Sequence, residues 1–379
     1  MEFPATHRLP LSWILEAASI PIQYRAYAEV VPADARDPAR LQALRAAVLD
    51  YRPAVAVARK QKSNGLWGGN LLGPGKSKAY GWTETGTVWQ YRRLLELGWP
   101  PDHRVFRATD RLLFQLLSRI EPDDPDPEVA ARARALLVEF ERPARADPGF
   151  GRWARQLGRE GAAAALARAG HAEDPRLRGV AHRVATDISQ FLRSETAQKP
   201  FVRAHGKTVL DPTAFPPSIF AVEMLAFMPA LQRERAGFIE RLGQYFAGPA
   251  PKRTYYVLAG KKLLKPLFPI LGDPLGADAR GHVSDVPFAL YWMELLARLG
   301  LLRQVAPAAR TFARLASECT EDGIWSPKNL RARPPAKSPL TAHYYPLEEA
   351  GHSPAQRQTD VSFRLALIAR LSGVQIQVR

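Results

Sequence analysis

The chain has 379 residues, of which 46% are hydrophobic and 24% are charged. This composition excludes a disordered polar chain and supplies enough apolar material for a large core. No apolar run reaches the ~18 positions that indicate a membrane span, and the amino terminus lacks the pattern of a signal peptide. The single cysteine, Cys319, excludes an intrachain disulfide. We therefore expect a cytoplasmic protein without a membrane span.

The chain is strongly basic, with 53 Lys and Arg against 37 Asp and Glu and a formal charge of +16. Such a charge attracts nucleic acid, an acidic membrane surface or an anionic ligand. A genome rich in G and C also produces it, by supplying many arginines to solvated faces. Because the cations are spread along the chain, we favour the second explanation.

Apolar residues recur at helical spacing along most of the chain, and alternating strand patterns are nearly absent. The predicted helices cover 84–97, 103–119, 128–141, 176–193, 218–228, 232–246, 285–300, 305–318 and 360–371. Helices of this length, joined by short turns rich in Pro, Gly and Asp, indicate antiparallel helical hairpins. Hairpins repeated along a chain form either an open solenoid or a closed ring.

Two short turns resemble each other. Residues 61–68 are QKSNGLWG, and residues 321–326 are EDGIWS. In each turn the glycine allows a sharp bend of the backbone, and the tryptophan anchors the bend against neighbouring helices. Three longer stretches, 63–82, 247–283 and 326–358, are predicted to be loops. Functional residues concentrate on loops of a rigid scaffold, so we expect the site there.

Three passages resemble the repeats of squalene cyclases and of protein prenyltransferase β-subunits. They are QKSNGLWGGN, followed by GWTETGTVWQYRRLLELGWPPDHRVFRATDRLL; SDVPFALYWMELLARLGLL; and TEDGIWSPKNL, followed later by TDVSFRLALIARLSG. They are most similar to bacterial squalene-cyclase-like proteins of unassigned activity. The resemblance implies an all-α fold in a single domain, 1–379: an α/α toroid (an α6/α6-type barrel of helical hairpins) with long loops at one rim. Residues 124–203 are either part of this ring or an inserted helical-repeat lobe.

The resemblance does not extend to the catalytic motifs of the family. The Asp-x-Asp-Asp acid of the cyclases is missing, and the similar string at Asp123–Asp126 lies in a proline-rich turn. The zinc site of the prenyltransferases combines Asp, Cys and His, whereas Cys319 has no Asp-x-Cys context. We therefore predict no metal and no cofactor, and we leave the activity unassigned.

Three carboxylates are candidate catalytic residues. Glu84, Asp285 and Asp360 each begin a predicted apolar helix. A helix start suits an acid, because the side chain caps free N–H groups and the helix dipole favours negative charge. In a closed barrel these equivalent starts would share one rim, where the acids could bind a cation or serve acid–base chemistry. The alternative is that they are three separate N-caps.

His343, Tyr344 and Tyr345 form a histidine–aromatic cluster in a predicted loop. His343 is a candidate general acid or base, and the two tyrosines are candidate ligand-binding residues. The alternative is that the tyrosines close the barrel end while His343 is a satisfied loop residue. We expect aromatic side chains and a histidine to line a central cavity: Trp82, Trp89, Tyr291, Trp292, His343 and Tyr344.

Three functions remain open. We favour a squalene-cyclase-like barrel that binds a small apolar or mixed ligand in its central cavity. The second function, less favoured, is a basic helical-repeat protein that binds nucleic acid, for which 252–265 supplies cations and aromatic rings. The third is a non-catalytic scaffold whose rim loops contact another protein.

Overall fold

The computed structural model describes residues 2–77, 84–118, 127, 148–330, 339–348 and 353–379. This part of the chain is mostly helical, with three small two-stranded sheets. The helices are α1 (Leu11–Ala17), α2 (Ile20–Arg25), η1 (Ala26–Val30), η2 (Ala33–Ala35), α3 (Pro38–Leu49), α4 (Arg52–Arg59), α5 (Thr87–Glu96), α6 (Arg104–Leu117), α9 (Pro148–Arg168), α10 (Pro175–Phe191), α11 (Glu195–Gln198), α12 (Ile219–Ala226), α13 (Pro229–Glu234), α14 (Ala236–Ala247), α15 (Val286–Arg298), α16 (Ala306–Ala316), η3 (Pro339–His343) and α17 (Pro354–Leu371). None of the helices in the described part has the length and apolar character that a membrane crossing requires.

Most of the predicted helices are present, with ends shifted by a few residues. The helix predicted for 128–141 lies outside the described residues. Two predicted starts are wrong. Helix α5 begins at Thr87 rather than at residue 84. Helix α17 begins at Pro354, well before residue 360, because the Ser353–Gln356 capping box starts it earlier.

The short turns share one backbone geometry, and the structure adds a third example. In each turn the N–H of the first residue donates to the carbonyl of the fifth, and the glycine N–H donates back to the carbonyl of the first. The residues are Lys62, Gly65 and Leu66; Asp278, Gly281 and His282; and Thr320, Gly323 and Ile324. The three glycines have φ of 85°, 80° and 92°, a region that other residues enter only with strain.

The three turns also pack in related ways. A Cβ on Gly65 would lie 2.8 Å from the Cβ of Ala108 on α6, and a Cβ on Gly281 would meet the backbone of α16 at Arg310. The first turn precedes α5 and packs against α6, and the second precedes α15 and packs against α16. A Cβ on Gly323 would instead meet Arg8, near the amino terminus. The last turn therefore packs against the beginning of the chain.

Helices α5, α9, α15 and α17 end in the same way. In each, a glycine of positive φ follows the helix, and the N–H of the next residue donates to the carbonyl five positions earlier. This hydrogen bond is that of a Schellman cap. The glycines are Gly98, Gly170, Gly300 and Gly373. The shared stop signal indicates that these four helices are equivalent elements.

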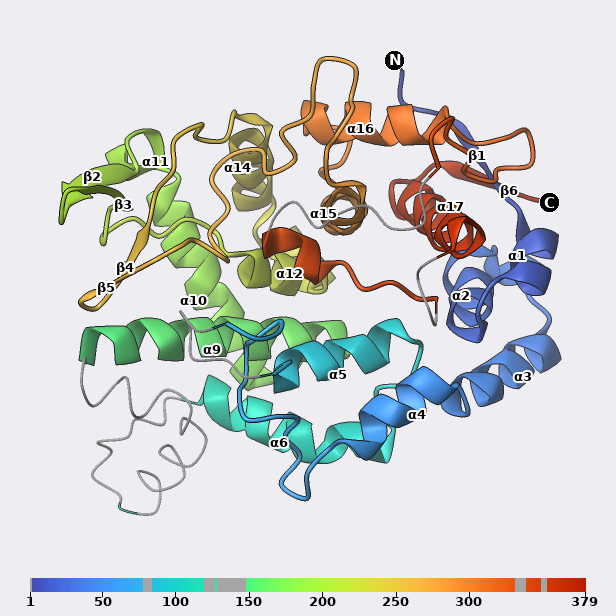
Figure 1. Ribbon diagram of the computed structural model, residues 1–379, viewed down its shortest axis with the longest axis horizontal. Coiled ribbons are helices and arrows are strands. Elements are labelled where there is room, and N and C mark those ends of the chain that lie inside the picture. Colours follow the sequence, from blue (N-terminus) through green and yellow to red (C-terminus); the bar gives the residue numbers. More distant parts are fainter. Residues whose placement is uncertain (1, 78–83, 119–126, 128–147, 331–338, 349–352) are drawn as a thin grey trace.

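Six helices follow one another in contact. Helix α5 packs on α9, α9 on α12, α12 on α15, α15 on α17, and α17 on α2. The guanidinium of Arg25 at the end of α2 donates to the carbonyl of Glu96 at the end of α5 (3.4 Å), so the series closes on itself. Strand β1 (Thr6–Leu9) pairs in parallel with β6 (Gln375–Val378). Figure 1 shows the two chain ends on the same side of the molecule.

Two antiparallel hairpins lie together at one edge of the molecule, on the left in Figure 1. They consist of β2 (Phe201–Ala204) with β3 (Lys207–Leu210), and of β4 (Val257–Ala259) with β5 (Lys262–Leu264). A parallel bridge between Val209 and Tyr256 joins them. The second hairpin falls within the stretch 247–283, which was predicted to be a loop.

Candidate functional site

Charged side chains pair with one another where the six helices of the closed series meet. Ten of the described side chains, five arginines and five carboxylates, form what we call the central ion-pair network. They are Arg25, Glu29, Arg92, Glu96, Arg168, Glu223, Glu294, Arg298, Asp360 and Arg364. They lie on α2, η1, α5, α9, α12, α15 and α17. The formal charges of the network balance.

Glu96 has four arginine partners in this network. Its carboxylate lies 2.9 Å from Arg92 and 3.2 Å from Arg168. Arg364 lies 3.3 Å away and Arg25 3.9 Å away. Burial alone would raise the pKa of Glu96, but the guanidinium groups outweigh burial and hold that pKa well below its ordinary value. Glu96 is therefore a buried, charged residue that connects α5 with three other helices.

Helices α5 and α15 carry the same ion pair in opposite order. Arg92 precedes Glu96 by one turn on α5, and Glu294 precedes Arg298 by one turn on α15. Each pair ends two residues before the glycine of its helix cap, so the pairs occupy equivalent positions. Arg168 lies between them, 3.2 Å from Glu96 and 4.0 Å from Glu294. Burial alone would raise the pKa of Glu294, but the charges of Arg298 and Arg168 outweigh burial and lower the pKa to about 2.

Of the three acids predicted at helix starts, Asp285 is an N-cap and Glu84 is not. Asp285 caps α15 by accepting a hydrogen bond from the N–H of Phe288 (3.0 Å), and it also accepts one from the hydroxyl of Thr341. Glu84 is exposed in the loop before α5, and its backbone carbonyl accepts a hydrogen bond from the amide of Asn70 (2.7 Å). The predicted helix start at Glu84 is wrong because the backbone is extended at Gly86, and α5 begins only after it.

Asp360 is not at a helix start either. It lies in the second turn of α17, where it is buried and pairs with Arg364 (3.0 Å). It also accepts a hydrogen bond from the hydroxyl of Tyr344. Asp360 and Asp285 thus both contact the segment 339–348, whereas Glu84 does not join them. Because neither Glu84 nor Asp360 begins a helix, the expectation that the three acids mark equivalent helix starts is wrong.

His343, at the end of η3, is buried among aromatic rings. Its ring centroid lies 4.6 Å from Trp89 and 5.6 Å from both Phe220 and Tyr291. The guanidinium of Arg92 donates to the His343 carbonyl. Burial, and then the charge of Arg92, hold the pKa of His343 well below its ordinary value. A neutral imidazole in this position favours a packing role over proton transfer.

The remaining predicted ligand-binding residues do not converge on one space. The hydroxyl of Tyr345 accepts a hydrogen bond from Arg93, whose guanidinium also lies over the Tyr345 ring. Trp292 is fully buried and packs edge-on against Phe246 of α14. Trp82 lies outside the described residues. The predicted aromatic side chains that the structure describes are therefore packed against other residues.

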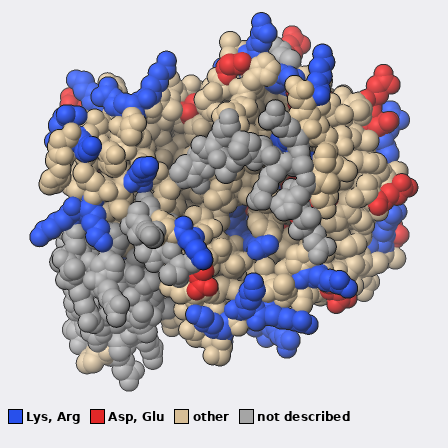
Figure 2. Space-filling model, in the orientation of Figure 1, with Lys and Arg blue, Asp and Glu red and all other residues tan. Residues whose placement is uncertain are grey.

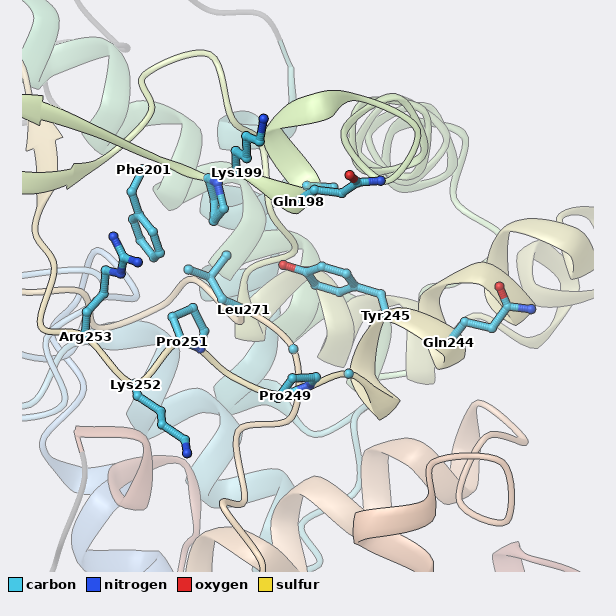
Figure 3. A pocket seen from close by; sticks show the side chains of 14 residues that line it. Gln198, Lys199, Phe201, Gln244, Tyr245, Pro249, Pro251, Lys252, Arg253 and Leu271 are labelled. Atoms are coloured by element: carbon cyan, nitrogen blue, oxygen red, sulfur yellow. The ribbon is translucent and has the colours of Figure 1, made fainter.

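An open groove of about 1000 Å³ lies between α11, the end of α14 and the segment 249–253 (Figure 3). We call it the basic groove, because Lys199, Lys252 and Arg253 are among its lining residues. Figure 3 shows the rings of Phe201 and Tyr245 pointing into the groove, while Lys199 and Lys252 extend outward from opposite sides.

The aromatic rings of the basic groove are held in place by other side chains. Phe201 packs against Tyr255, with ring centroids 5.0 Å apart, and the guanidinium of Arg253 lies 5.6 Å above the Phe201 ring. Tyr245 packs edge-on against Phe191 of α10 at 5.8 Å. Burial raises the pKa of Tyr255 to about 12, so its hydroxyl is neutral at physiological pH.

A smaller and more enclosed pocket of about 160 Å³ lies between α9, the start of α12 and the segment 257–269. We call it the Glu160 pocket. Its walls are mainly apolar and aromatic, and they include Trp153, Leu157, Phe215, Leu258, Leu267 and Phe268.

Glu160 is the buried acid of this pocket. Its carboxyl group accepts hydrogen bonds from the hydroxyl of Ser218, the N-cap of α12, and from the amide of Gln156 (3.1 Å). Within the described part of the chain, no Lys or Arg forms an ion pair with it. Burial raises the pKa of Glu160, the two hydrogen bonds lower it, and the charge of Asp187 raises it again, with a net upward shift.

The chain matches no protein-family model, no curated protein and no solved structure. Among the residues that the structure describes, no three His, Cys, Asp or Glu side chains come together as a metal site requires.

Glu160, Ser218 and the central ion-pair network were not predicted from the sequence. One available signal was a pair of opposite charges one turn apart on helices that are otherwise apolar, Arg92 with Glu96 and Glu294 with Arg298. Glu160 has no comparable signal, because Ser218, one of its two hydrogen-bond partners, is 58 residues away in sequence.

Proposed function

We propose that the chain is an α/α toroid resembling the repeat fold of squalene cyclases and prenyltransferases. Three observations support this: the closed series of six helices, the common cap of four of them, and the turn that recurs before α5, α15 and α17. Helix α9 contacts α5 and α12 and supplies Arg168 to the central ion-pair network. This favours the part of 124–203 that contains α9 as a ring element rather than an inserted lobe.

Small-angle X-ray scattering tests the toroid. A closed domain of this length has a radius of gyration of about 21 Å. We expect a value close to this, independent of protein concentration. An extended superhelix would give a clearly larger radius and a maximum dimension several times the width of a helix pair, and that result would contradict the closed ring.

We further propose that the protein binds a small, largely apolar ligand with one polar group, and that the ligand occupies the Glu160 pocket. The observation that carries this proposal is a buried acid with a raised pKa in a mainly apolar pocket, where none of the described Lys and Arg side chains forms an ion pair with it. Such perturbed groups in clefts mark functional sites more often than ordinary core positions. The centre of the ring is a less suitable place, because its charged side chains are already paired with one another.

The size of the pocket limits the ligand. A volume of about 160 Å³ is close to that of the ~150 Å³ apolar cavity that holds benzene. The pocket therefore fits a group of about one ring. In its neutral form Glu160 can donate one hydrogen bond to an oxygen of the ligand, which orients the polar end toward α9 and the start of α12.

Binding of three one-ring probes tests this proposal: toluene, p-cresol and benzylamine, measured by thermal stabilisation and by quenching of tryptophan fluorescence. We expect p-cresol to bind, and to stabilise the protein by about 1.4 kcal/mol at ten times its dissociation constant. Glu160→Leu should weaken p-cresol binding more than toluene binding, because it removes the hydrogen-bond donor and only p-cresol has a polar group.

Two substitutions opposite each other in one hairpin provide the control. Leu258 lines the pocket, whereas its cross-strand partner Leu263 does not. Leu258→Trp should fill the pocket and abolish probe binding, while Leu263→Trp should leave it unchanged. Equal probe binding by both variants would place the probe elsewhere and overturn the proposal. Tighter binding of benzylamine than of p-cresol would show that Glu160 accepts a cation instead.

A further inference from the structure

We propose that the basic groove is a second binding site, for ligands that combine a phosphate with a planar base, either single-stranded nucleic acid or a free nucleotide. This inference is independent of the Glu160 pocket, since the lining of one includes none of the lining residues of the other.

The two chain segments that supply the cations of the groove are strongly basic. Residues 199–211 and 252–265 contain eight Lys and Arg and a single carboxylate, Asp211. These two short stretches carry nearly half of the formal charge of +16. Figure 2 shows many more Lys and Arg than Asp and Glu side chains over the two hairpins, on the left of the view. Such a one-sided cluster is the electrostatic footprint of a phosphate-binding surface.

The cations of the groove are available to a ligand. Lys199, Lys252 and Arg253 are exposed, and none of them forms an ion pair with a carboxylate in the described part of the chain. Asp211 is already engaged, because it accepts hydrogen bonds from the backbone and hydroxyl of Thr213 (2.8 and 2.7 Å). Glu195 on α11 is the carboxylate nearest to Lys199 in sequence, and it does not line the groove.

The groove also offers a planar stacking surface. Arg253 lies over the ring of Phe201, which in turn packs against Tyr255. A guanidinium held against a ring is pre-organised: it presents a flat face to a base and N–H donors to a phosphate. Phosphate-binding charge next to stacking planes is the combination that proteins use for single strands.

The shape of the site favours a nucleic-acid chain or nucleotide over a lipid surface. A membrane presents a plane of headgroups, which contacts a flat or convex basic face. Here the rings lie inside a concavity of about 1000 Å³, with Lys199 and Lys252 on opposite sides of it. A ligand that enters the concavity can place a base near Arg253 and Phe201 and its phosphates near the lysines.

Fluorescence anisotropy with a labelled 15-nucleotide single strand tests the proposal, with a labelled mononucleotide as a second probe. If the strand makes three phosphate contacts, raising the salt from 50 to 200 mM should weaken binding by about 20-fold. Lys252→Glu combined with Arg253→Glu should weaken binding at least tenfold. Phe201→Leu should weaken it about fivefold or more without changing the salt dependence, because it removes stacking and not charge.

A matched control separates the site from general charge attraction. Arg52→Glu combined with Arg59→Glu makes the same change of net charge on exposed residues of α4, away from the groove. This variant should bind the strand like the original protein. An equal loss in both double variants, or no binding at 50 mM salt, would overturn the proposal.

The remaining probes identify the source of the ligand. A mononucleotide that binds as tightly as the 15-nucleotide strand would support the shared chemistry and point to a free nucleotide. Vesicles that contain 30% phosphatidylserine provide the lipid arm. Binding to vesicles that is lost in the Lys252 and Arg253 variant, without binding to either nucleic-acid probe, would overturn the proposal in favour of a membrane surface.

Discussion

The central ion-pair network and the Glu160 pocket shift the pKa values of buried carboxylates in opposite directions. Glu96 and Glu294 are surrounded by guanidinium groups, which lower the pKa of both acids in spite of burial. Glu160 is equally buried, but its partners are a hydroxyl and an amide, and its pKa is raised. The comparison shows that the partners, and not burial alone, decide the direction in which the pKa of a buried acid shifts. A charged acid links helices, whereas a neutral one can donate a hydrogen bond to a ligand.

The largest expected effect comes from removing one charge of the network. Glu96→Gln leaves four arginines without their common carboxylate, so buried positive charge loses its compensation. We expect the free energy of unfolding to fall by about 3–5 kcal/mol, the usual cost of breaking a buried pair from one side. Urea unfolding at pH 7, followed by circular dichroism, measures this loss.

Two further glutamates calibrate that result. Glu29 pairs with Arg25 at 2.6 Å but is one-third exposed (33%), so Glu29→Gln should cost only about 1 kcal/mol. Glu84 is exposed and outside the network, so Glu84→Gln should change the unfolding free energy by less than about 0.5 kcal/mol. A loss for Glu96→Gln no larger than that for Glu29→Gln would show that the network does not hold the helices together.

The positions of the helices could be predicted from the sequence because helical periodicity is a local property. The errors arise at helix ends, which depend on capping. The start of α17 has a local signal, Ser353 followed three residues later by Gln356, so the predicted start at residue 360 was avoidable. The start of α5 has no local signal. It depends on a close approach of Gly86 to Asn70 and Leu71, which are distant in sequence and would collide with a Cβ at this position.

The candidate sites were less predictable than the helices. The opposite charges of Glu294 and Arg298, one turn apart, are visible in the sequence, but the burial of Glu294 beside Arg168 and Arg364 is not. Their surroundings depend on helices that are distant in sequence. The basic and aromatic character of 252–265 was recognised, because composition alone reveals it. Its partner segment, with Lys199 and Phe201, comes near it only in the folded chain.

A smaller effect of opposite sign is expected for Glu160. Replacing Glu160 with Gln keeps the shape of the neutral acid and removes the possibility of ionisation. The folded-state pKa of Glu160 is raised, so the unfolded chain releases this proton at lower pH than the folded chain does. Stability of the original protein therefore falls, relative to Glu160→Gln, as the pH rises from about 4.3 through the folded-state pKa, and the difference is constant above it.

The comparison of Glu160→Gln with the original protein at pH 4 and pH 8 isolates this term. Protonation of Glu96 and Glu294, whose folded-state pKa values are lowered, destabilises both proteins equally as the pH falls below about 4.3, so it cancels in the difference. Glu160→Gln should be the more stable protein at pH 8 and nearly equal at pH 4. If Glu160→Gln were less stable than the original protein by the same amount at pH 4 and at pH 8, Glu160 would be charged in the folded protein at both pH values. The two buried regions would then not differ in the way that their partners imply.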